Sequence, residues 1–309
     1  RHNKYGLTHQ TWQDSLTGYI HENGDSLNLS HPIAYLEVQA LTVDGLLRTA
    51  DTLQADNPEK SAQWRKAAHE IRHATLQDFW DEEDQFFVSS IDRDKNGEPR
   101  KDGVEQSDPG WMLNTAIFDG LPPDERQKYI TAIVTKLFSS DFLTDAGIRS
   151  RSVEYAETVG VADYHGSLVS WPIDTYMAAK GLRRQGFPKL ADQLEARILN
   201  SVNASGDFYE FFYVEPDGTV LLNPEAARKK TSGAENFPVQ MFPEKGIAWT
   251  VAATLMIKYR NGKRALHPEN PTPPSWESEL EQDILAHIPD ISPIKAVSEL
   301  HKKFTAEPG

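Results

Sequence analysis

The sequence predicts a mainly α-helical fold in which paired helices form part of a ring, with short β-hairpins in the connecting loops. Apolar residues recur at helical spacing through most of the 309 residues. The helical segments come in pairs, and long loops join the pairs. The pairs share no short repeat, which disfavours a solenoid of similar units. A toroid, in which inner and outer helices alternate, accommodates these three observations.

Two helix pairs are predicted in the first half of the chain. Residues 31–54 carry apolar side chains at helical spacing, with a proline in the first turn, where a helix tolerates it. Residues 57–81 begin with Asn-Pro, which is typical of a helix start. A short strand that runs into a turn is expected at 85–100. The second pair is expected at 109–121 and 122–138.

The second half continues this organisation. A third pair is predicted at 166–186 and 188–202, and each helix ends near Gly or Asn. Residues 206–222 are expected to form a hairpin with Asp-Gly at the turn, and 244–259 another helix. About seven long helices result, whereas six closed hairpins contain twelve, so the chain is expected to be part of such a toroid. The remaining expected elements are a Pro-rich connector at 264–276 and a small helix at 293–304.

Composition excludes several classes of protein. The formal net charge of −14 argues against binding to nucleic acid or to an anionic membrane surface. No apolar run approaches the roughly 18–20 residues that span a bilayer. The absence of cysteine excludes disulfides, thiol catalysis and zinc–thiolate sites, and it fits a reducing cytoplasm, where we expect the protein.

Acidic and aromatic residues crowd the predicted loops, as a carbohydrate site requires. Sugar rings stack on Trp and Tyr, and their hydroxyls bind carboxylates. Glycoside hydrolysis needs one protonated carboxyl group for the leaving oxygen and one ionised carboxylate that activates water or attacks carbon. The same residue types also serve packing and helix caps. The stretches are TWQDS (11–15), SDPGW (107–111), GIRSRS (147–152), YHGSLVSWPID (164–174), FYEFF (208–212) and ENFPVQMFPEKGIAW (235–249).

In this order, the stretches resemble the C-terminal half of the bacterial glycogen-debranching, amylo-α-1,6-glucosidase-like proteins. Those belong to the (α/α)6-toroid glycosidases, which include the trehalases and the processing α-glucosidase and mannosylglycerate hydrolase family. The resemblance implies that residues 1–262 are the C-terminal part of a toroid catalytic domain and that 263–309 form a connector and an extension packed on it. It also implies that a missing N-terminal part of the same precursor, or a partner chain, supplies the remaining helices.

The resemblance assigns roles to individual residues. Asp14 in GLTHQTWQDS matches the family's general acid, and Glu210 in DFYEFFY matches its base. Gln13 stands where the family pattern has Lys, and Asp108 and Trp111 stand where it has Asn and His. The residues expected around the sugar are Trp12, Glu37, Gln39, Trp111, Arg149, Tyr164, His165, Trp171, Asp174, Glu235 and Trp249.

Most of these roles have a structural alternative. Asp14 suits a helix N-cap or a loop hydrogen bond, and the alternation in FYEFFYVE allows Glu210 to face solvent. Glu37 and Gln39 are expected to be buried hydrogen-bonded residues, with a sugar contact as the alternative. Glu235 is a reserve candidate for the base or a sugar contact. Trp12, Trp171 and His165 suit either the sugar or packing, and Arg149 is expected to orient a carboxylate.

Two acidic stretches are expected to be solvated. DRDKNG (92–97) begins like a calcium loop, but the twelfth position, which needs a bidentate Glu, is Gly103. We expect a hairpin turn there, with no metal and no cofactor in the protein. WESELEQD (276–283) is expected to be a solvated face.

The sequence therefore predicts an inverting glycoside hydrolase that acts on an α-glucosidic bond, with α-1,6 branches of a glycogen-like glucan as the main hypothesis. Inversion predicts that roughly 6.5–9.5 Å separates the two carboxyl groups. The alternatives are a disaccharide or glucosylglycerate-type α-glycosidase of the same toroid group, a non-catalytic glycan-binding relative, and a helical interaction scaffold whose acidic and aromatic loops do not converge.

Overall fold

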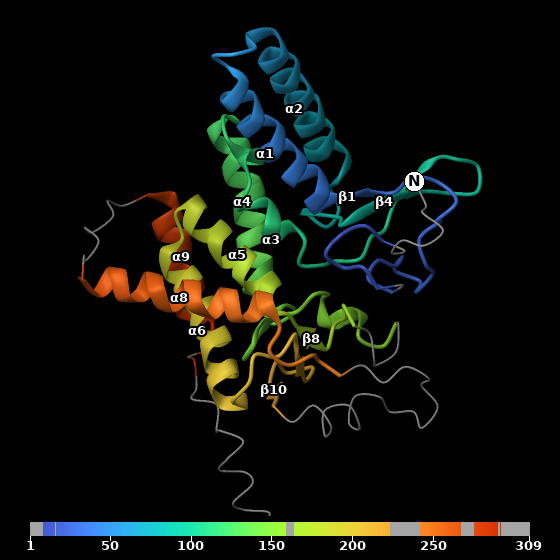
Figure 1. Ribbon diagram of the computed structural model, residues 1–309. Coiled ribbons are helices and arrows are strands. Elements are labelled where there is room, and N and C mark those ends of the chain that lie inside the picture. Colours follow the sequence, from blue (N-terminus) through green and yellow to red (C-terminus); the bar gives the residue numbers. More distant parts are fainter. Residues whose placement is uncertain are drawn as a thin grey trace, which may run out of the picture.

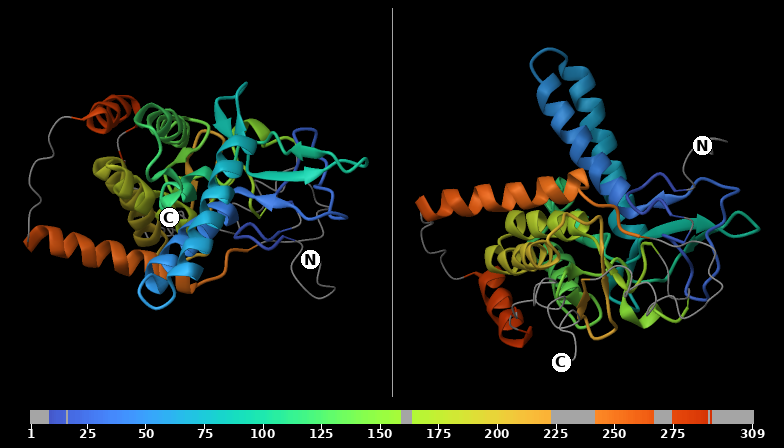
Figure 2. Two further views of the ribbon diagram at one scale, coloured as in Figure 1. Left: turned by 90° about the horizontal axis from the view of Figure 1, so that it is seen from above. Right: turned by 60° about the horizontal axis from the view of Figure 1, so that its bottom comes forward.

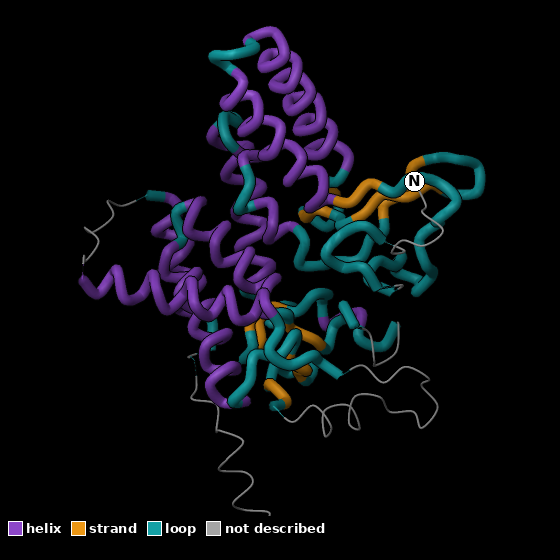
Figure 3. The backbone as a smooth tube through the Cα atoms, viewed as in Figure 1, coloured by secondary structure: helices purple, strands orange, loops and turns teal. Residues whose placement is uncertain are grey.

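Helices dominate the computed structural model, and short strands gather in the loops beside them (Figures 1 and 3). The structure describes residues 9–15, 17–158, 164–222, 242–266, 275–289 and 291. These elements confirm the predicted mainly helical class with small hairpins, and closure into a six-hairpin ring remains a prediction. Within the described residues, no helix is both long and apolar enough to cross a membrane.

The first helix pair, α1 (Leu36–Leu53) and α2 (Pro58–Asp78), projects from the rest of the molecule in Figure 1. Asn57 caps α2 by accepting from the backbone N–H of Lys60, so the predicted start is confirmed. The predicted start of α1 is wrong by several residues. Ala34 and Tyr35 form strand β1 (Ala34–Tyr35), which pairs with β4 (Ser90–Arg93). Strand pairing therefore displaces the helical turn that the apolar pattern predicts.

The predicted helix at 109–121 is broken into α3 (Pro109–Met112) and the 3-10 helix η1 (Ala116–Phe118). Thr115 adopts an extended conformation between them, and its hydroxyl accepts from the N–H of Ile117. A threonine that caps a new turn in this way interrupts a continuous helix. The next helix, α4 (Pro123–Leu137), lies where the sequence predicts it.

The third pair is α5 (Pro172–Gln185) and α6 (Pro188–Ser205), which end at Gly186 and Gly206. Both glycines have positive φ, 100° and 73°, as left-handed helix ends require. Helix α8 (Ala248–Leu266) contacts α5 and α6 and continues beyond the predicted domain boundary at 262.

The expectation that residues 276–283 are a solvated face is wrong. They begin helix α9 (Trp276–His287), which lies beside α4 when the molecule is viewed from above (Figure 2). Glu281 is only 4% exposed, and its Oε1 accepts from the N–H groups of Lys189 and Leu190 at the start of α6. A carboxylate at the positive end of a helix satisfies otherwise unpaired amides. The predicted small helix at 293–304 lies outside the described residues.

Small antiparallel sheets fill the loops. The expected hairpin at 206–222 is confirmed, and its first strand also pairs with β8. The DRDKNG stretch is the turn between β4 and β5, as expected, but Asp92 is buried against Arg100 and His21 rather than solvated. The strands not yet given are β2 (Trp80–Asp81), β3 (Phe86–Phe87), β5 (Pro99–Lys101), β6 (Leu143–Thr144), β7 (Gly147–Ile148), β8 (Val169–Ser170), β9 (Phe212–Val214) and β10 (Val220–Leu221).

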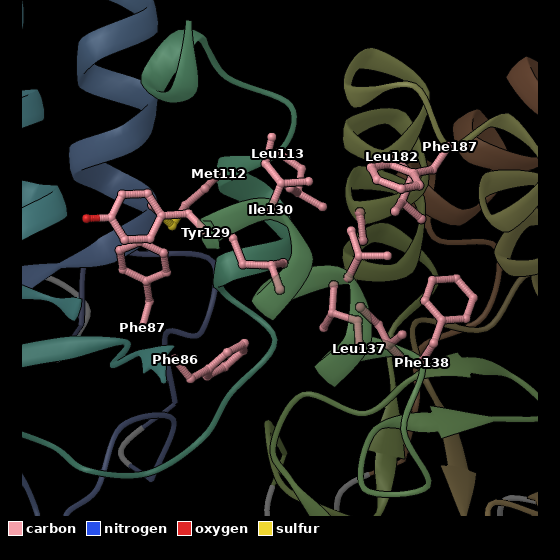
Figure 4. Close-up of a cluster of buried hydrophobic side chains, with 14 of the residues drawn as sticks. Phe86, Phe87, Met112, Leu113, Tyr129, Ile130, Leu137, Phe138, Leu182 and Phe187 are labelled. Atoms are coloured by element: carbon pink, nitrogen blue, oxygen red, sulfur yellow. The ribbon is translucent and has the colours of Figure 1, made fainter. Parts of the chain in front are cut away.

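The largest hydrophobic core lies between α3, α4, α5 and the strand β3 (Figure 4). Phe87 and Tyr129 bring their ring centroids within 5.1 Å at one side of it. Leu182 and Phe187 close the other side and are fully buried. A second cluster, formed by Val169, Trp171, Phe211 and Tyr213, packs under the loops that carry the candidate site. The loops thus rest on a rigid base.

Candidate active site

The segment 9–15, which carries Asp14, forms neither helix nor strand and is held by side chains from distant parts of the chain. Trp12 Nε1 donates to Asp108 Oδ1 at 2.7 Å. Gln13 Nε2 lies 3.2 and 3.1 Å from the two carboxylate oxygens of Asp108. Because Asp108 directly precedes α3, the start of that helix fixes the two residues ahead of Asp14.

The residue after Asp14 is anchored as well. Ser15 Oγ and His165 Nδ1 lie 2.9 Å apart. Burial lowers the pKa of His165 to about 3, and the positive charges of Arg151 and His9 act in the same direction. The imidazole is therefore neutral at pH 7 and serves here as a hydrogen-bonding partner of the segment.

Asp14 itself is half-buried. Burial raises the pKa of its carboxyl group, while a backbone hydrogen bond and the charge of His9 act in the opposite direction. The helix-cap alternative is wrong, because the next helix along the chain, α1, begins only at Leu36. A partly desolvated carboxyl group with a raised pKa is suited to carry a proton.

Glu210 lies just before β9 and is 5% exposed, so the alternative of a solvent-facing strand residue is wrong. Tyr164 Oη donates to Glu210 Oε1 in a short hydrogen bond. The backbone N–H of Glu244 lies 3.2 Å from Glu210 Oε2, and the Glu210 N–H donates to the Glu244 carbonyl at 2.9 Å. Both carboxylate oxygens are therefore held by donors.

Tyr164 connects the two carboxyl groups electrostatically. Burial raises the pKa of its hydroxyl, and so do the hydrogen bond to Glu210, the charge of Glu210 and the charge of Asp14. The Tyr164 hydroxyl thus donates a hydrogen bond to the carboxylate of Glu210, and the charge of Asp14 contributes to its raised pKa. The two loops converge, contrary to the expectation for an interaction scaffold.

Stacked rings surround this point. The rings of His165 and Trp171 stack with centroids 4.8 Å apart, and Tyr164 meets Trp171 edge-on at 4.8 Å. Trp12 stacks on Trp111 at 5.8 Å and 16°. His165 and Trp171 are buried, whereas Trp12, Trp111 and Tyr164 keep accessible surface. The first two support the site, and the last three offer ring surface to a ligand.

Three buried carboxyl groups lie behind the rings. Asp174 Oδ1 accepts from Trp111 Nε1 at 2.6 Å, and Glu37 Oε1 accepts from Tyr19 Oη at 3.2 Å. Burial raises the pKa of Asp174 to about 8 and, with the charge of Asp108 as a second cause, raises that of Glu37 well above its usual range. Glu37 and Asp174 are at most 1% exposed and hydrogen-bonded, so the expectation that Glu37 is a buried hydrogen-bonded residue is confirmed, and a contact of either residue with a sugar stays a prediction.

The remaining predicted residues have other surroundings. Arg149 is fully buried and donates to the carbonyl groups of residues 167, 215 and 216, so it orients backbone rather than a carboxylate. Gln39 lines a separate cavity of about 650 Å³ between α2, β4 and β5. Trp249 lies at the start of α8 and is 36% exposed; its neighbour Thr250 donates to the carbonyl of Tyr209, beside Glu210. Glu235 lies outside the described residues.

Sequence reasoning missed the residues that hold this site together. Asp108 and Gln13 are visible in the sequence only as departures from the resembled pattern, and Ser15 and Glu244 lie within the motif stretches but were given no role. Their roles depend on tertiary contacts, such as the one between positions 13 and 108.

A solved structure, the neutral trehalase Nth1 from Saccharomyces cerevisiae, is similar with 17% sequence identity and a TM-score of 0.49. The similarity covers 84% of this chain and 41% of the trehalase chain, so this chain spans less than half of that protein's length. No curated protein sequence matches the chain at a significant level.

A family model gives the assignment. Residues 37–221 match the family described as the Mannosylglycerate hydrolase MGH1-like glycoside hydrolase domain. This range includes Glu210, Tyr164, His165, Trp171 and Trp111, whereas Trp12 and Asp14 precede it. The match names a glycoside hydrolase without the glycogen-debranching description that the resemblance implied. Because the matched region is more than half of the sequence, the chain belongs to the MGH1-like glycoside hydrolase family.

Proposed function

We propose that Asp14 is the general acid and Glu210 the general base of an inverting α-glycosidase that acts on a disaccharide or a glycosylglycerate. The observation that carries the proposal is the position of Tyr164, whose hydroxyl donates to Glu210 and whose pKa is raised further by the charge of Asp14. Two carboxyl groups around one point are what glycoside hydrolysis needs.

The two carboxyl groups have different surroundings, which supports different roles. Asp14 has a raised pKa through burial, and a protonated carboxyl can give its proton to the leaving oxygen. Glu210 accepts from Tyr164 and from the N–H of Glu244, so its oxygens are oriented to accept a proton from water. The water attacks the anomeric carbon from the face opposite the leaving group, and the configuration inverts.

The accessible rings support a carbohydrate substrate. Trp12, Trp111 and Tyr164 present partly exposed faces beside the carboxyl groups, and sugar C–H faces pack on such rings. The family description names mannosylglycerate hydrolase, which favours a small glycoside over the branch points of a large glucan. The α-1,6 glucan of the main sequence hypothesis is therefore the less favoured substrate.

The test is hydrolysis of a panel that contains mannosylglycerate, glucosylglycerate, trehalose, isomaltose and a limit dextrin, with the released anomer followed by proton NMR. We expect turnover of a small glycoside with release of the β-anomer first. Asp14→Asn and Glu210→Gln should each lower kcat by about 10²–10⁴-fold. Asp56→Asn and Glu59→Gln make the same chemical changes at exposed positions and should not.

Three outcomes would contradict the proposal. Release of the sugar whose anomeric carbon is attacked as its α-anomer would exclude inversion. Full activity of either Asp14→Asn or Glu210→Gln would exclude that residue from its role. Binding of a glycoside by the wild-type protein without turnover would support the non-catalytic alternative.

A further inference from the structure

Asp108 holds both residues that precede the proposed acid. It is fully buried at the start of α3, and its carboxylate accepts from Trp12 Nε1 and from Gln13 Nε2. Its side chain does not reach the surface, so a substrate cannot touch it. Nevertheless, its two partners are adjacent in sequence to Asp14, in a segment without regular secondary structure.

A second buried carboxyl group completes the arrangement. Asp174, at the start of α5, accepts from Trp111 Nε1 at 2.6 Å, and Trp111 stacks on Trp12. Both indole N–H groups of the stacked pair therefore point into the protein toward carboxyl oxygens. Asp108 and Asp174 thus hold the two rings from the protein interior, and one of these rings, Trp12, belongs to the segment that carries Asp14.

We propose that Asp108 is the positioning residue of the active site: it sets the place of Asp14 through Trp12 and Gln13. This inference rests on the acid role proposed for Asp14. While the segment is hydrogen-bonded to Asp108, Asp14 keeps one position relative to the substrate, and Trp12 stays stacked on Trp111. Without Asp108, Trp12 and Gln13 lose these hydrogen bonds, and the acid is displaced while the helices remain folded.

The chemistry of the two partners suggests informative variants. In Asp108→Leu both hydrogen bonds are lost. In Asp108→Asn the amide oxygen still accepts from Trp12. Once the Gln13 amide has rotated, the asparagine nitrogen can donate to Gln13 Oε1, which is buried and has no hydrogen-bond partner among the described residues. Asparagine should therefore rescue much of what leucine loses, whereas a purely electrostatic role would not be rescued.

The experiment combines hydrogen–deuterium exchange of peptides covering 9–15 with kinetics on the glycoside that the wild-type protein turns over best. Asp108→Leu should speed exchange in 9–15 but not in α1 and α2, and should lower kcat by about 10²-fold, as a displacement of about 1 Å can. KM should stay within about threefold, since a displaced acid affects mainly the chemical step. The kcat of Asp108→Asn should stay at least about tenfold above that of Asp108→Leu.

Asp102→Leu is the matched control, because Asp102 is also buried and its Oδ2 accepts from the Ser90 hydroxyl at 2.8 Å rather than from the segment. It should leave exchange in 9–15 unchanged. If Asp108→Leu does not fold, Trp12→Phe combined with Gln13→Leu removes the same two hydrogen bonds from the other side and should give the same exchange and kcat.

Unchanged exchange in 9–15 for these variants would overturn the proposal, whether or not the protein has activity. Faster exchange with unchanged kcat in an active enzyme would overturn the link to Asp14. If the wild-type protein turns over no glycoside, the proposed function fails, and faster exchange in Asp108→Leu still establishes Asp108 as the anchor of the segment.

Discussion

Replacing Tyr164 with phenylalanine removes one oxygen from the centre of the candidate site. The hydroxyl donates to Glu210 Oε1, and its removal leaves the N–H of Glu244 as the remaining described donor to that carboxylate. The ring itself is retained, so its packing against Trp171 and Phe211, at 4.8 and 5.3 Å, should persist. The change therefore isolates the hydrogen bond.

The expected loss follows from the strength of that bond. A hydrogen bond to a charged group contributes about 1.5–3 kcal/mol, which corresponds to roughly 10- to 150-fold in rate if it acts fully in the transition state. The Glu244 N–H remains in place, so the lower part of this range applies, and we expect kcat to fall by about 10- to 30-fold. KM should change little, because the sugar-facing rings are intact.

The assay is steady-state hydrolysis of the best glycoside by wild type and Tyr164→Phe, with thermal unfolding measured on the same samples. Tyr129→Phe is a matched control, since the Tyr129 hydroxyl also meets a glutamate, Glu125 at 3.4 Å, but in α4. A wild-type kcat in Tyr164→Phe would refute the view that this hydroxyl holds the base. A large fall in kcat in Tyr129→Phe would show that the assay reports general damage.

Three further predictions concern protons and helix ends. In wild type, kcat/KM should fall as pH rises through the raised pKa of Asp14, and this limb should be absent from the residual activity of Asp14→Asn; a limb that persists would assign the acid elsewhere. Burial raises the pKa of Asp102 to about 8. Between about pH 4 and pH 8 the native state therefore keeps a proton on Asp102 that the unfolded chain releases. The contribution of this group to stability is fully present below pH 4 and is lost as the pH rises to about 8. Asp102→Asn should remove this loss, so the melting temperature of the variant should rise relative to that of wild type between pH 5 and pH 8. A difference in melting temperature that stays constant over this range would refute the assigned pKa. Glu281→Ala should destabilise the protein by about 0.5–2 kcal/mol in urea unfolding, because two amides at the start of α6 lose their acceptor, and Glu281→Gln should cost less; equal losses would argue against capping.

Local patterns predicted much of the fold. Asn57-Pro marked the start of α2, and Asp217-Gly218 marked the hairpin turn, because both depend on neighbouring residues alone. The errors arose where tertiary contacts prevailed. Pairing with β4 converted 34–35 into a strand, and burial of Glu281 against α6 gave a glutamate-rich helix an inner face.

The candidate site was predictable to the extent that its residues belong to motifs. The resemblance named Asp14, Glu210 and Tyr164. The Tyr164 hydroxyl donates to Glu210, and His165, next to Tyr164, lies 2.9 Å from the hydroxyl of Ser15, next to Asp14. It also named Glu37 and Asp174 as sugar contacts, and the structure places both behind the rings, where they are buried. No sequence pattern predicts which carboxyl group accepts a hydrogen bond from a tryptophan, because that depends on how α3 and α5 pack against the segment 9–15.

The segment that carries Asp14 has a consequence for the order of folding. Its anchors, Asp108 and His165, lie roughly 95 and 150 positions further along the chain, and contacts between such distant residues form late because closing long loops costs entropy. Helices α1 to α6 rely on nearer contacts. On refolding from urea, helical circular dichroism should therefore recover before the tryptophan signal of Trp12, and competence for hydrolysis should return with the slower phase. The candidate site should therefore be among the last parts of the described structure to form.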